Sequence, residues 1–195
     1  MSIAVINSGG ANLGSVTHAL RRLGVDSRLT RDAAEIRSAS RVILPGVGAA
    51  GSAMRALREA GLVEVIRSLT QPVLGICLGL QLLYQHSSEG ETECLGIIPG
   101  RVERMAGGAG LRLPHMGWSQ LHWEQGDQLS GGLEGHEWFY FVHTYAAPVD
   151  HAVATATHGQ RFAAVVRHNN FAACQFHPEK SAGPGARILR NFLET

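Results

Sequence analysis

The apolar positions in the first half of the chain alternate between strand-like runs and helical spacing. Four segments have the pattern of buried strands: "SIAVIN" (2–7), "SRLT" (27–30), "RVILP" (41–45) and "PVLGI" (72–76). Segments between and after them place apolar residues on one face and predict helices near 16–23, near 32–38, between "PGVG" (45–48) and Gly61, over 63–69 and near 78–84. Alternating strands and helices of this size indicate parallel strands joined by right-handed helical crossovers.

The second half is richer in strands. Its strand-like segments are "GRVERM" (100–105), "SQLHWE" (119–124), "EWFYFVH" (137–143), "AVATATH" (152–158), "FAAVVRH" (162–168) and "FAACQF" (171–176). A last helix is expected from about Gly185 to the C-terminus. No repeat or linker interrupts the pattern, so we expect one α/β domain over 1–195, with a mostly parallel central sheet and a β-rich second half.

Composition narrows the class of protein. The 195 residues are 45% hydrophobic and 17% charged, and a net charge of +1 gives no reason to expect nucleic acid or a membrane as partner. The three cysteines are widely spaced and no His/Cys cluster has metal-ligand spacing, so neither a disulfide framework nor a metal site is expected. With no basic leader and no long apolar segment, the sequence predicts a cytoplasmic protein without a cofactor.

One cysteine lies at a predicted strand-to-helix turn, a position typical of a catalytic nucleophile. In "PVLGICLGLQLL" (72–83), Cys77 stands between Gly75 and Gly79, where a strand is expected to turn sharply into a helix. Such an elbow presents a nucleophile over helix amides that favour a thiolate and donate to an oxyanion. The alternative is that Cys77 is a buried structural cysteine, which is our interpretation of Cys94 and Cys174.

A thiolate nucleophile needs an oriented base, and "QFHPEKS" (175–181) contains the best candidate. His177 and Glu179 are two residues apart, so in an extended segment both side chains project to one side. Pro178 keeps His177 out of helical geometry. The glutamate is then placed to hold one ring nitrogen, which leaves the other for the thiol. A surface histidine beside a glutamate is the alternative interpretation.

Other segments are consistent with a cleft around Cys77. The "PGVG" turn (45–48) after a predicted strand exposes amides, although a plain strand–helix connection has the same pattern. Gln81 is one helical turn after Cys77, where its amide meets a substrate unless it is simply a partly exposed polar residue. His115 and His143 lie in segments able to line a cleft, but taken singly they are interpreted as packing or loop residues.

Taken together, these residues resemble the class I (triad) glutamine amidotransferases. "GICLGLQ" is similar to the nucleophile elbow of that family and "FHPE" to its His-Glu pair, and both the order and the separation of Cys77 and His177 are suitable. The resemblance implies a three-layer α/β fold. Within the family, the chain resembles the glutaminase subunits of imidazole glycerol phosphate synthases, through "ANLGSV", "LPGVGAA", "LPHMGW" and "FYFVHTYA".

The resemblance implies a mechanism and a set of site residues. Cys77 would attack the carboxamide of glutamine to form a thioester, and His177, oriented by Glu179, would protonate the leaving ammonia and then activate water. The amides of Val47 or Gly48 and of Leu78 would form the oxyanion hole. Gln81 and Glu89 would contact the glutamine head group. The backbone of Thr144 and Tyr145 would contact its carboxylate.

The resemblance also implies a partner. This is a separate (β/α)₈ cyclase subunit, which would use the ammonia to make imidazole glycerol phosphate and aminoimidazole carboxamide ribonucleotide in histidine biosynthesis. Trp118 is the candidate anchor at that interface. The chain departs from the family pattern at Asn7-Ser8, at Ser119, where Asn is usual, and near Arg112. Two alternatives stay open: a glutaminase for pyridoxal phosphate or anthranilate synthesis, and a catalytically silent interaction module.

Overall fold

An eight-stranded sheet organises the computed structural model, which describes residues 2–9, 13–108 and 110–194. The strand order is β2-β1-β3-β4-β14-β13-β12-β9. The strands are β1 (Ile3–Ile6), β2 (Arg28–Thr30), β3 (Arg41–Gly46), β4 (Val73–Cys77), β9 (His122–Trp123), β12 (Ala152–His158), β13 (Gln160–His168) and β14 (Phe171–Cys174). From β2 to β14 the strands are parallel, and the other three continue antiparallel. The predicted mostly parallel α/β sheet is confirmed.

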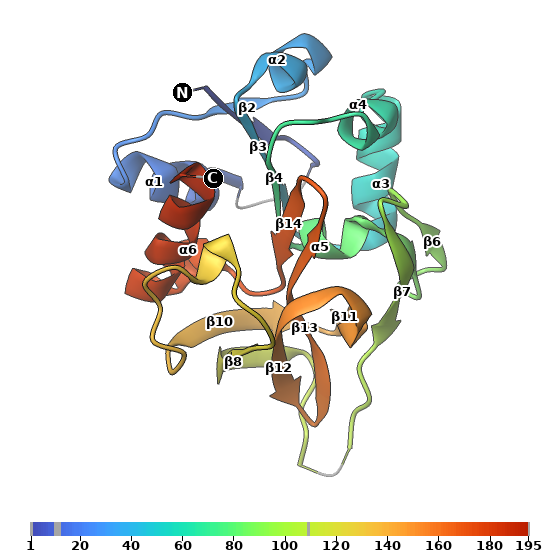
Figure 1. Ribbon diagram of the computed structural model, residues 1–195. Coiled ribbons are helices and arrows are strands. Elements are labelled where there is room, and N and C mark those ends of the chain that lie inside the picture. The colour runs from blue at the N-terminus through green and yellow to red at the C-terminus, as the bar shows by residue number, and fades with distance from the viewer. Residues whose placement is uncertain (1, 10–12, 109, 195) are drawn as a thin grey trace.

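Helices cover both faces of this sheet. They are α1 (Leu13–Arg22), α2 (Ala33–Ser38), α3 (Ala50–Glu59), α4 (Val63–Arg67), α5 (Leu78–Leu82) and α6 (Ala182–Glu194). Figure 1 shows α1 and α6 on one side of the sheet and α3, α4 and α5 on the other. One apolar cluster joins α2–α5 to the sheet, and a second joins α1 and α6 to its opposite face. The three layers therefore follow from apolar stripes that the helices bury.

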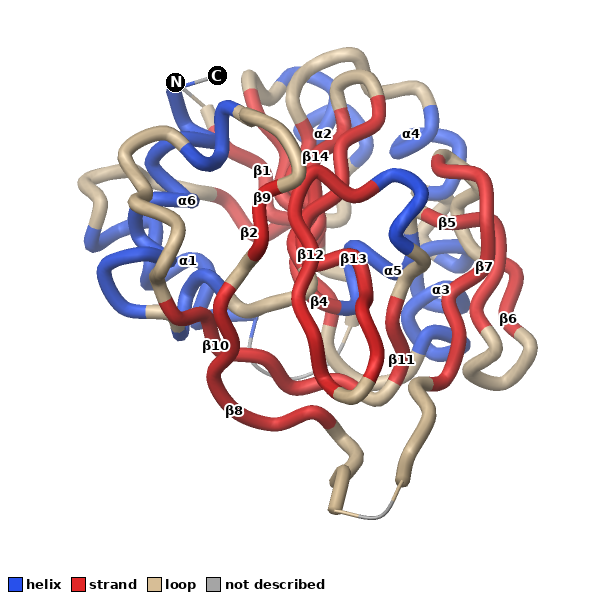
Figure 2. The backbone as a smooth tube through the Cα atoms, turned by 60° about the horizontal axis from the view of Figure 1, so that its bottom comes forward, coloured by secondary structure: helices blue, strands red, loops and turns tan. Residues whose placement is uncertain are grey.

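Two smaller sheets flank the main one. The first has the order β11-β7-β5-β6, with β5 (Tyr84–Ser87), β6 (Thr92–Glu93), β7 (Ile98–Arg104) and β11 (Tyr145–Ala146). The second is an antiparallel ribbon of β8 (His115–Gln120) and β10 (Trp138–His143). Figure 2 shows this ribbon below the β12–β13 hairpin. Short 3₁₀ helices complete the description: η1 (Gln128–Ser130), η2 (Val149–His151) and η3 (Pro178–Lys180).

Several predicted boundaries are shifted by a few residues, as at α6, which begins at Ala182 and not near Gly185, and three differences have a clear structural cause. The helix expected over 78–84 ends at Leu82, because Tyr84 is fully buried and pairs with Ile98 as the first residue of β5. The strand expected over 119–124 is divided between β8 and β9, which belong to different sheets. The strand expected over 171–176 ends at Cys174, and the chain then turns toward the candidate site.

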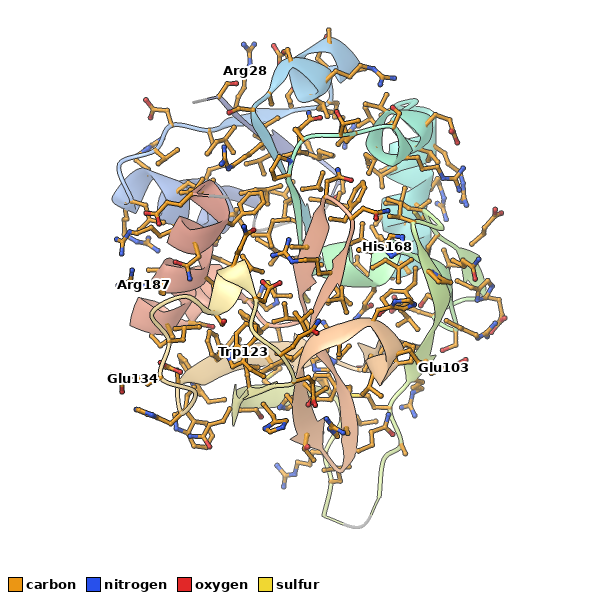
Figure 3. The ribbon with its side chains drawn as sticks, viewed as in Figure 1. Arg28, Glu103, Trp123, Glu134, His168 and Arg187 are labelled. Atoms are coloured by element: carbon orange, nitrogen blue, oxygen red, sulfur yellow. The ribbon has the colours of Figure 1, made fainter. Side chains whose placement is uncertain are left out.

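Apolar side chains fill the interior, and charged side chains gather at the periphery. Figure 3 shows Arg28, Glu103, Glu134 and Arg187 directed away from the centre of the molecule. Within the described part of the chain, no helix combines the length and the apolar character that crossing a bilayer requires.

Candidate active site

Cys77 stands at a strained turn between β4 and α5. Its backbone angles are φ 55° and ψ −110°, and it directly precedes the first residue of α5. A non-glycine residue in this region stores about 1–3 kcal/mol of strain, which the surrounding structure must offset. The sharp turn brings the side chain out of the sheet and toward the helix N-terminus, as the sequence pattern predicts.

The flanking glycines are required by close packing. A Cβ on Gly79 would lie 1.9 Å from the Leu44 carbonyl oxygen. A Cβ on Gly75 would lie 2.9 Å from both the Ala173 Cβ and the Gly79 oxygen. Both contacts are far shorter than van der Waals distances, so β3, β4 and α5 approach this closely only because Cβ atoms are missing. The G-x-C-x-G pattern therefore has a direct steric cause.

The Cys77 sulfur is largely buried, yet it opens into a cavity of about 310 Å³. Two groups outside α5 reach it. Its thiol is 3.9 Å from the Val142 carbonyl oxygen, and the Gln175 side-chain amide donates to the sulfur at 3.7 Å. The sulfur is thus held between β10 and the chain that follows β14, on the wall of the cavity.

His177 enters the same cavity, with Glu179 behind it. The Nδ1–H of His177 donates to Glu179 Oε1 at 2.8 Å, and both side chains are almost fully buried. Here one detail of the prediction is wrong. His177 is extended, but Pro178 starts the 3₁₀ helix η3, so Glu179 reaches the ring through a tight turn rather than an extended segment. The pairing itself is as the sequence predicts.

The proton affinity of His177 is strongly perturbed. Burial alone would lower its pKa, but the neighbouring Cys77 sulfur and the Glu179 carboxylate outweigh burial and raise the pKa to about 10. His177 Nε2 is buried and has no hydrogen-bond partner among the described residues. His177 lines the cavity, and because Glu179 takes Nδ1, Nε2 is the nitrogen left free to exchange a proton with a reacting group.

The other predicted binding residues line this cavity. They are Val47, Gly48, Leu78, Gln81, Glu89, Thr144 and Tyr145. Gln81 is buried rather than partly exposed, and its side-chain amide donates to the Tyr145 carbonyl at 2.9 Å and to Gln175 Oε1 at 3.0 Å. These two bonds fix the Gln81 side chain before any ligand binds.

The turn after β3 faces Cys77 across the cavity. Gly48 has a φ of +91°, which favours glycine at this position. Glu89 Oε2 accepts a hydrogen bond of 2.7 Å from the Ala50 amide and so caps α3 directly after the turn. Ser8, part of the unusual Asn7-Ser8 pair, donates to the Pro45 carbonyl at 2.9 Å. The turn is therefore anchored on both sides by side chains from other elements.

Sequence reasoning missed several residues at the site. Pro114, Val142, His143 and Lys180 also line the cavity. His143 lies in a segment expected to be able to line a cleft, although taken singly it is interpreted as a packing or loop residue; it ends β10 with its ring buried against the site. Gln175 gives no signal, because its contact with Cys77 joins residues 98 positions apart.

Trp118 lies outside the cavity, on the outer face of the β8–β10 ribbon. Met116, Trp118 and Trp138 are 64%, 49% and 54% exposed, and the Trp118 ring packs edge-on against Tyr140. Opposite residues of a ribbon share a face, so Trp118 and Tyr140 lie on one side and Ser119 and Phe139 on the other. Three exposed large apolar side chains therefore lie on one small ribbon.

No group of three or more His, Cys, Asp or Glu side chains within residues 2–9, 13–108 and 110–194 is arranged to hold a metal ion. Cys94 and Cys174 are buried and unpaired by disulfides, as expected of structural cysteines. Burial raises the pKa of Cys94 to about 11 and that of Cys174 well above its ordinary value. Both thiols therefore stay protonated at neutral pH.

Comparison with known proteins defines the class. The family model "Glutamine amidotransferase class-I" matches residues 4–195. The chain belongs to this family, which confirms the resemblance seen in its sequence. It is therefore a glutamine-hydrolysing enzyme of the Cys-His-Glu type.

Close relatives carry a more specific name. "Imidazole glycerol phosphate synthase subunit HisH" of Xanthomonas axonopodis pv. citri is 58% identical over 193 residues, which cover 98% of this chain and 96% of that protein. "Imidazole glycerol phosphate synthase subunit HisH 2" of Legionella pneumophila is 52% identical, with the same coverage of both chains.

Solved structures support the fold. A structure titled "Crystal structure of glutamine amidotransferase" superposes with a TM-score of 0.76 at 23% identity, covering 98% of this chain and 97% of the other. A glutamine amidotransferase from Thermotoga maritima superposes with a TM-score of 0.69 at 18% identity, covering 100% of this chain and 96% of the other.

Proposed function

We propose that this chain is the glutaminase subunit of an imidazole glycerol phosphate synthase in histidine biosynthesis. Relatives of that name, 52–58% identical over nearly the whole of both chains, support the proposal. The chain hydrolyses glutamine to glutamate and passes the ammonia to a separate (β/α)₈ cyclase subunit. The cyclase uses it to form imidazole glycerol phosphate and aminoimidazole carboxamide ribonucleotide.

The chemistry is proposed to begin at Cys77. Its sulfur attacks the carboxamide carbon of glutamine, and the C–N bond then breaks to leave a glutamyl thioester. The imidazolium of His177 gives its proton to the departing nitrogen, so that ammonia leaves. A water molecule next attacks the thioester, His177 takes up the proton of that water, and the C–S bond breaks to release glutamate. The observation that carries this mechanism is the one cavity that Cys77 and His177 share.

The remaining wall of the cavity fits a small amino acid with a developing oxyanion. We assign the oxyanion to the amides of Val47 or Gly48 and of Leu78, because these residues flank the sulfur across the turn and at the start of α5. Gln81 and Glu89 hold the glutamine head group, and the Thr144–Tyr145 backbone meets its carboxylate. Glu179 orients His177 through the 2.8 Å bond to Nδ1.

The partner is proposed to dock on the outer face of the β8–β10 ribbon. Ammonia released into neutral water becomes largely protonated and loses its nucleophilicity, so it must pass directly into the cyclase. The apolar side chains of Met116, Trp118 and Trp138 suit a buried interface with Trp118 as anchor. Val142 belongs to the same ribbon and also lines the cavity, so the docking face and the ammonia source are adjacent.

The decisive test is glutamate release, measured with and without the cyclase and its nucleotide substrate. We expect slow release from the lone chain and fast release from the complex. In Cys77→Ala, glutamine-dependent synthesis should disappear while synthesis from added ammonium salts continues. The control Cys94→Ala should retain both activities, since Cys94 is buried away from the cavity.

Each other outcome contradicts part of the proposal. Loss of both activities in Cys77→Ala means that the cysteine is structural. Stimulation by the acceptor enzymes of pyridoxal phosphate or anthranilate synthesis, and not by the cyclase, means that the pathway assignment is wrong.

A further inference from the structure

A chain of hydrogen bonds runs from the β8–β10 ribbon to the cavity. The Ser119 hydroxyl lies 3.1 Å from His115 Nε2, and His115 Nδ1 lies 3.1 Å from His143 Nε2. His143 Nδ1 then lies 2.9 Å from the Tyr145 carbonyl oxygen. All four residues are on or next to the ribbon, and the mechanism proposed above uses neither histidine nor Ser119.

The carbonyl at one end fixes the direction of every bond in this chain. A carbonyl oxygen only accepts, so His143 must carry its proton on Nδ1. In a neutral ring Nε2 is then an acceptor, so His115 must donate to it from Nδ1. The Nε2 of His115 is in turn an acceptor, and the Ser119 hydroxyl must supply the donor. One arrangement of protons therefore satisfies all three contacts.

The surroundings keep both rings neutral. His115 stacks on Phe141 and on His158, and His143 packs against Phe162. Burial, with a smaller contribution from the charge of His158, lowers the pKa of His115 to about 4. Burial, the largest influence, lowers the pKa of His143 to about 3, although its bond to Tyr145 opposes the change. At neutral pH neither ring carries a second proton that would allow another arrangement.

The far end of the chain meets a residue of the glutamine pocket. The Tyr145 carbonyl oxygen accepts a second bond, at 2.9 Å, from the side-chain amide of Gln81. His143, Tyr145 and Gln81 all line the cavity. Whatever holds the Tyr145 carbonyl in place therefore also holds Gln81. Ser119 is on the inner face of the ribbon, beside Trp118 on the outer face.

We infer that Ser119, His115 and His143 are positioning residues whose one-directional hydrogen-bond chain holds the Tyr145 carbonyl and Gln81 in the geometry that binds glutamine. This inference rests on the proposed function, because it takes glutamine as the ligand of the cavity. It assigns a role to Ser119, where the chain departs from the usual asparagine. A side-chain amide also donates a hydrogen bond, so both residue types are able to start the chain.

Nitrogen NMR tests the proton arrangement without any reference to activity. In the wild-type chain at neutral pH, correlation spectra of the imidazole rings should show His115 and His143 as neutral rings protonated on Nδ1. The spectrum of His115→Phe assigns the His115 signals by their absence. A ring protonated on Nε2, or on both nitrogens, at either position overturns the inference.

Kinetics with the cyclase complex test the positioning role. Loss of one hydrogen bond in Ser119→Ala should raise the KM for glutamine about threefold, and His115→Phe, which keeps an aromatic ring, should raise it about tenfold. In both variants kcat should change less than KM. Ser119→Asn should stay within about twofold of the wild type because the donor is restored. The control Ser38→Ala, on the exposed end of α2, should match the wild type.

A double-mutant cycle separates this role from general destabilisation. Ser119 acts only through His115, so Ser119→Ala should have no effect on KM in the His115→Phe background. Additive effects, or thermal destabilisation with unchanged KM, would overturn the inference. If the wild-type complex releases no glutamate from glutamine, the proposed function fails, whereas the NMR result still decides the proton arrangement.

Discussion

Replacing Glu179 with glutamine tests whether the charge behind His177, and not only an acceptor oxygen, sets the protonation of the ring. Glu179 Oε1 accepts the His177 Nδ1–H at 2.8 Å, with the two side chains 3% and 5% exposed. Glutamine keeps the size and an acceptor oxygen but removes the negative charge. The pKa of His177 should therefore fall from about 10 toward its ordinary value.

The size of the effect follows from that pKa. A rise from 6.5 to about 10 corresponds to roughly 5 kcal/mol in favour of the imidazolium in the folded chain. The Cys77 sulfur contributes part of this, so we expect Glu179→Gln to lower the free energy of unfolding by about 2–3 kcal/mol at neutral pH, as for a hydrogen bond between charged groups. Because the imidazolium donates the proton to the departing carboxamide nitrogen, kcat for glutamate release should fall on the order of 10²- to 10⁴-fold.

The pH dependence gives the sharpest check. Folding raises the pKa of His177, so protonation of this ring stabilises the folded chain. The stabilisation is complete below the unfolded-state pKa of about 6.5 and is lost as the pH rises through about 10. Urea unfolding at a series of pH values should therefore show a gap between the free energies of unfolding of wild type and variant, and this gap should narrow as the pH approaches 10. The exposed Glu59→Gln serves as control and should show no gap. A gap that is independent of pH, or unchanged kcat, would refute this reasoning.

Two further predictions concern the elbow and the ribbon. Gly79→Ala forces a Cβ to within 1.9 Å of the Leu44 oxygen. Calorimetry should therefore show that the free energy of unfolding falls by about 3 kcal/mol or more, and glutamate release should be lost. In the control Gly183→Ala, in α6, the added Cβ meets nothing within 4 Å, so this variant should be neutral or slightly stabilising. Equal destabilisation by Gly79→Ala and Gly183→Ala would contradict the steric explanation. Trp118→Ala should weaken binding to the cyclase about 30-fold by calorimetric titration, whereas Leu29→Ala on the edge strand β2 should not. Equal affinities would mean that the ribbon is not the docking face.

The parts of the fold that the sequence predicts are those governed by local pattern. The strand and helix periodicity of the first half, and the sharp turn at Cys77, are set by residues close together in the chain. Boundaries are less predictable where tertiary packing decides them. Tyr84 has no local signal that ends a helix, and it joins β5 because β7 is available to pair with it.

The candidate site likewise contains residues that local sequence motifs predict and residues that only tertiary packing brings together. Cys77 and the His177–Glu179 pair are visible as local motifs, although the 3₁₀ turn that joins the latter two is not. Gln175 and His143 are not recognisable, because their contacts with the site come from folding together the elements that carry them. His143 is a packing residue, as expected of it singly, and it also lines the cavity, as its segment allowed. One histidine in an aromatic strand gives no sign of which face it occupies.

The most direct measurement is the covalent labelling of the complex by a glutamine-like electrophile, located by peptide mass spectrometry. We expect labelling of Cys77 and not of Cys94 or Cys174, slowed by glutamine in competition and by His177→Ala. An unlabelled Cys77, or equal labelling of all three cysteines, would show that the sulfur in this cavity is not the nucleophile.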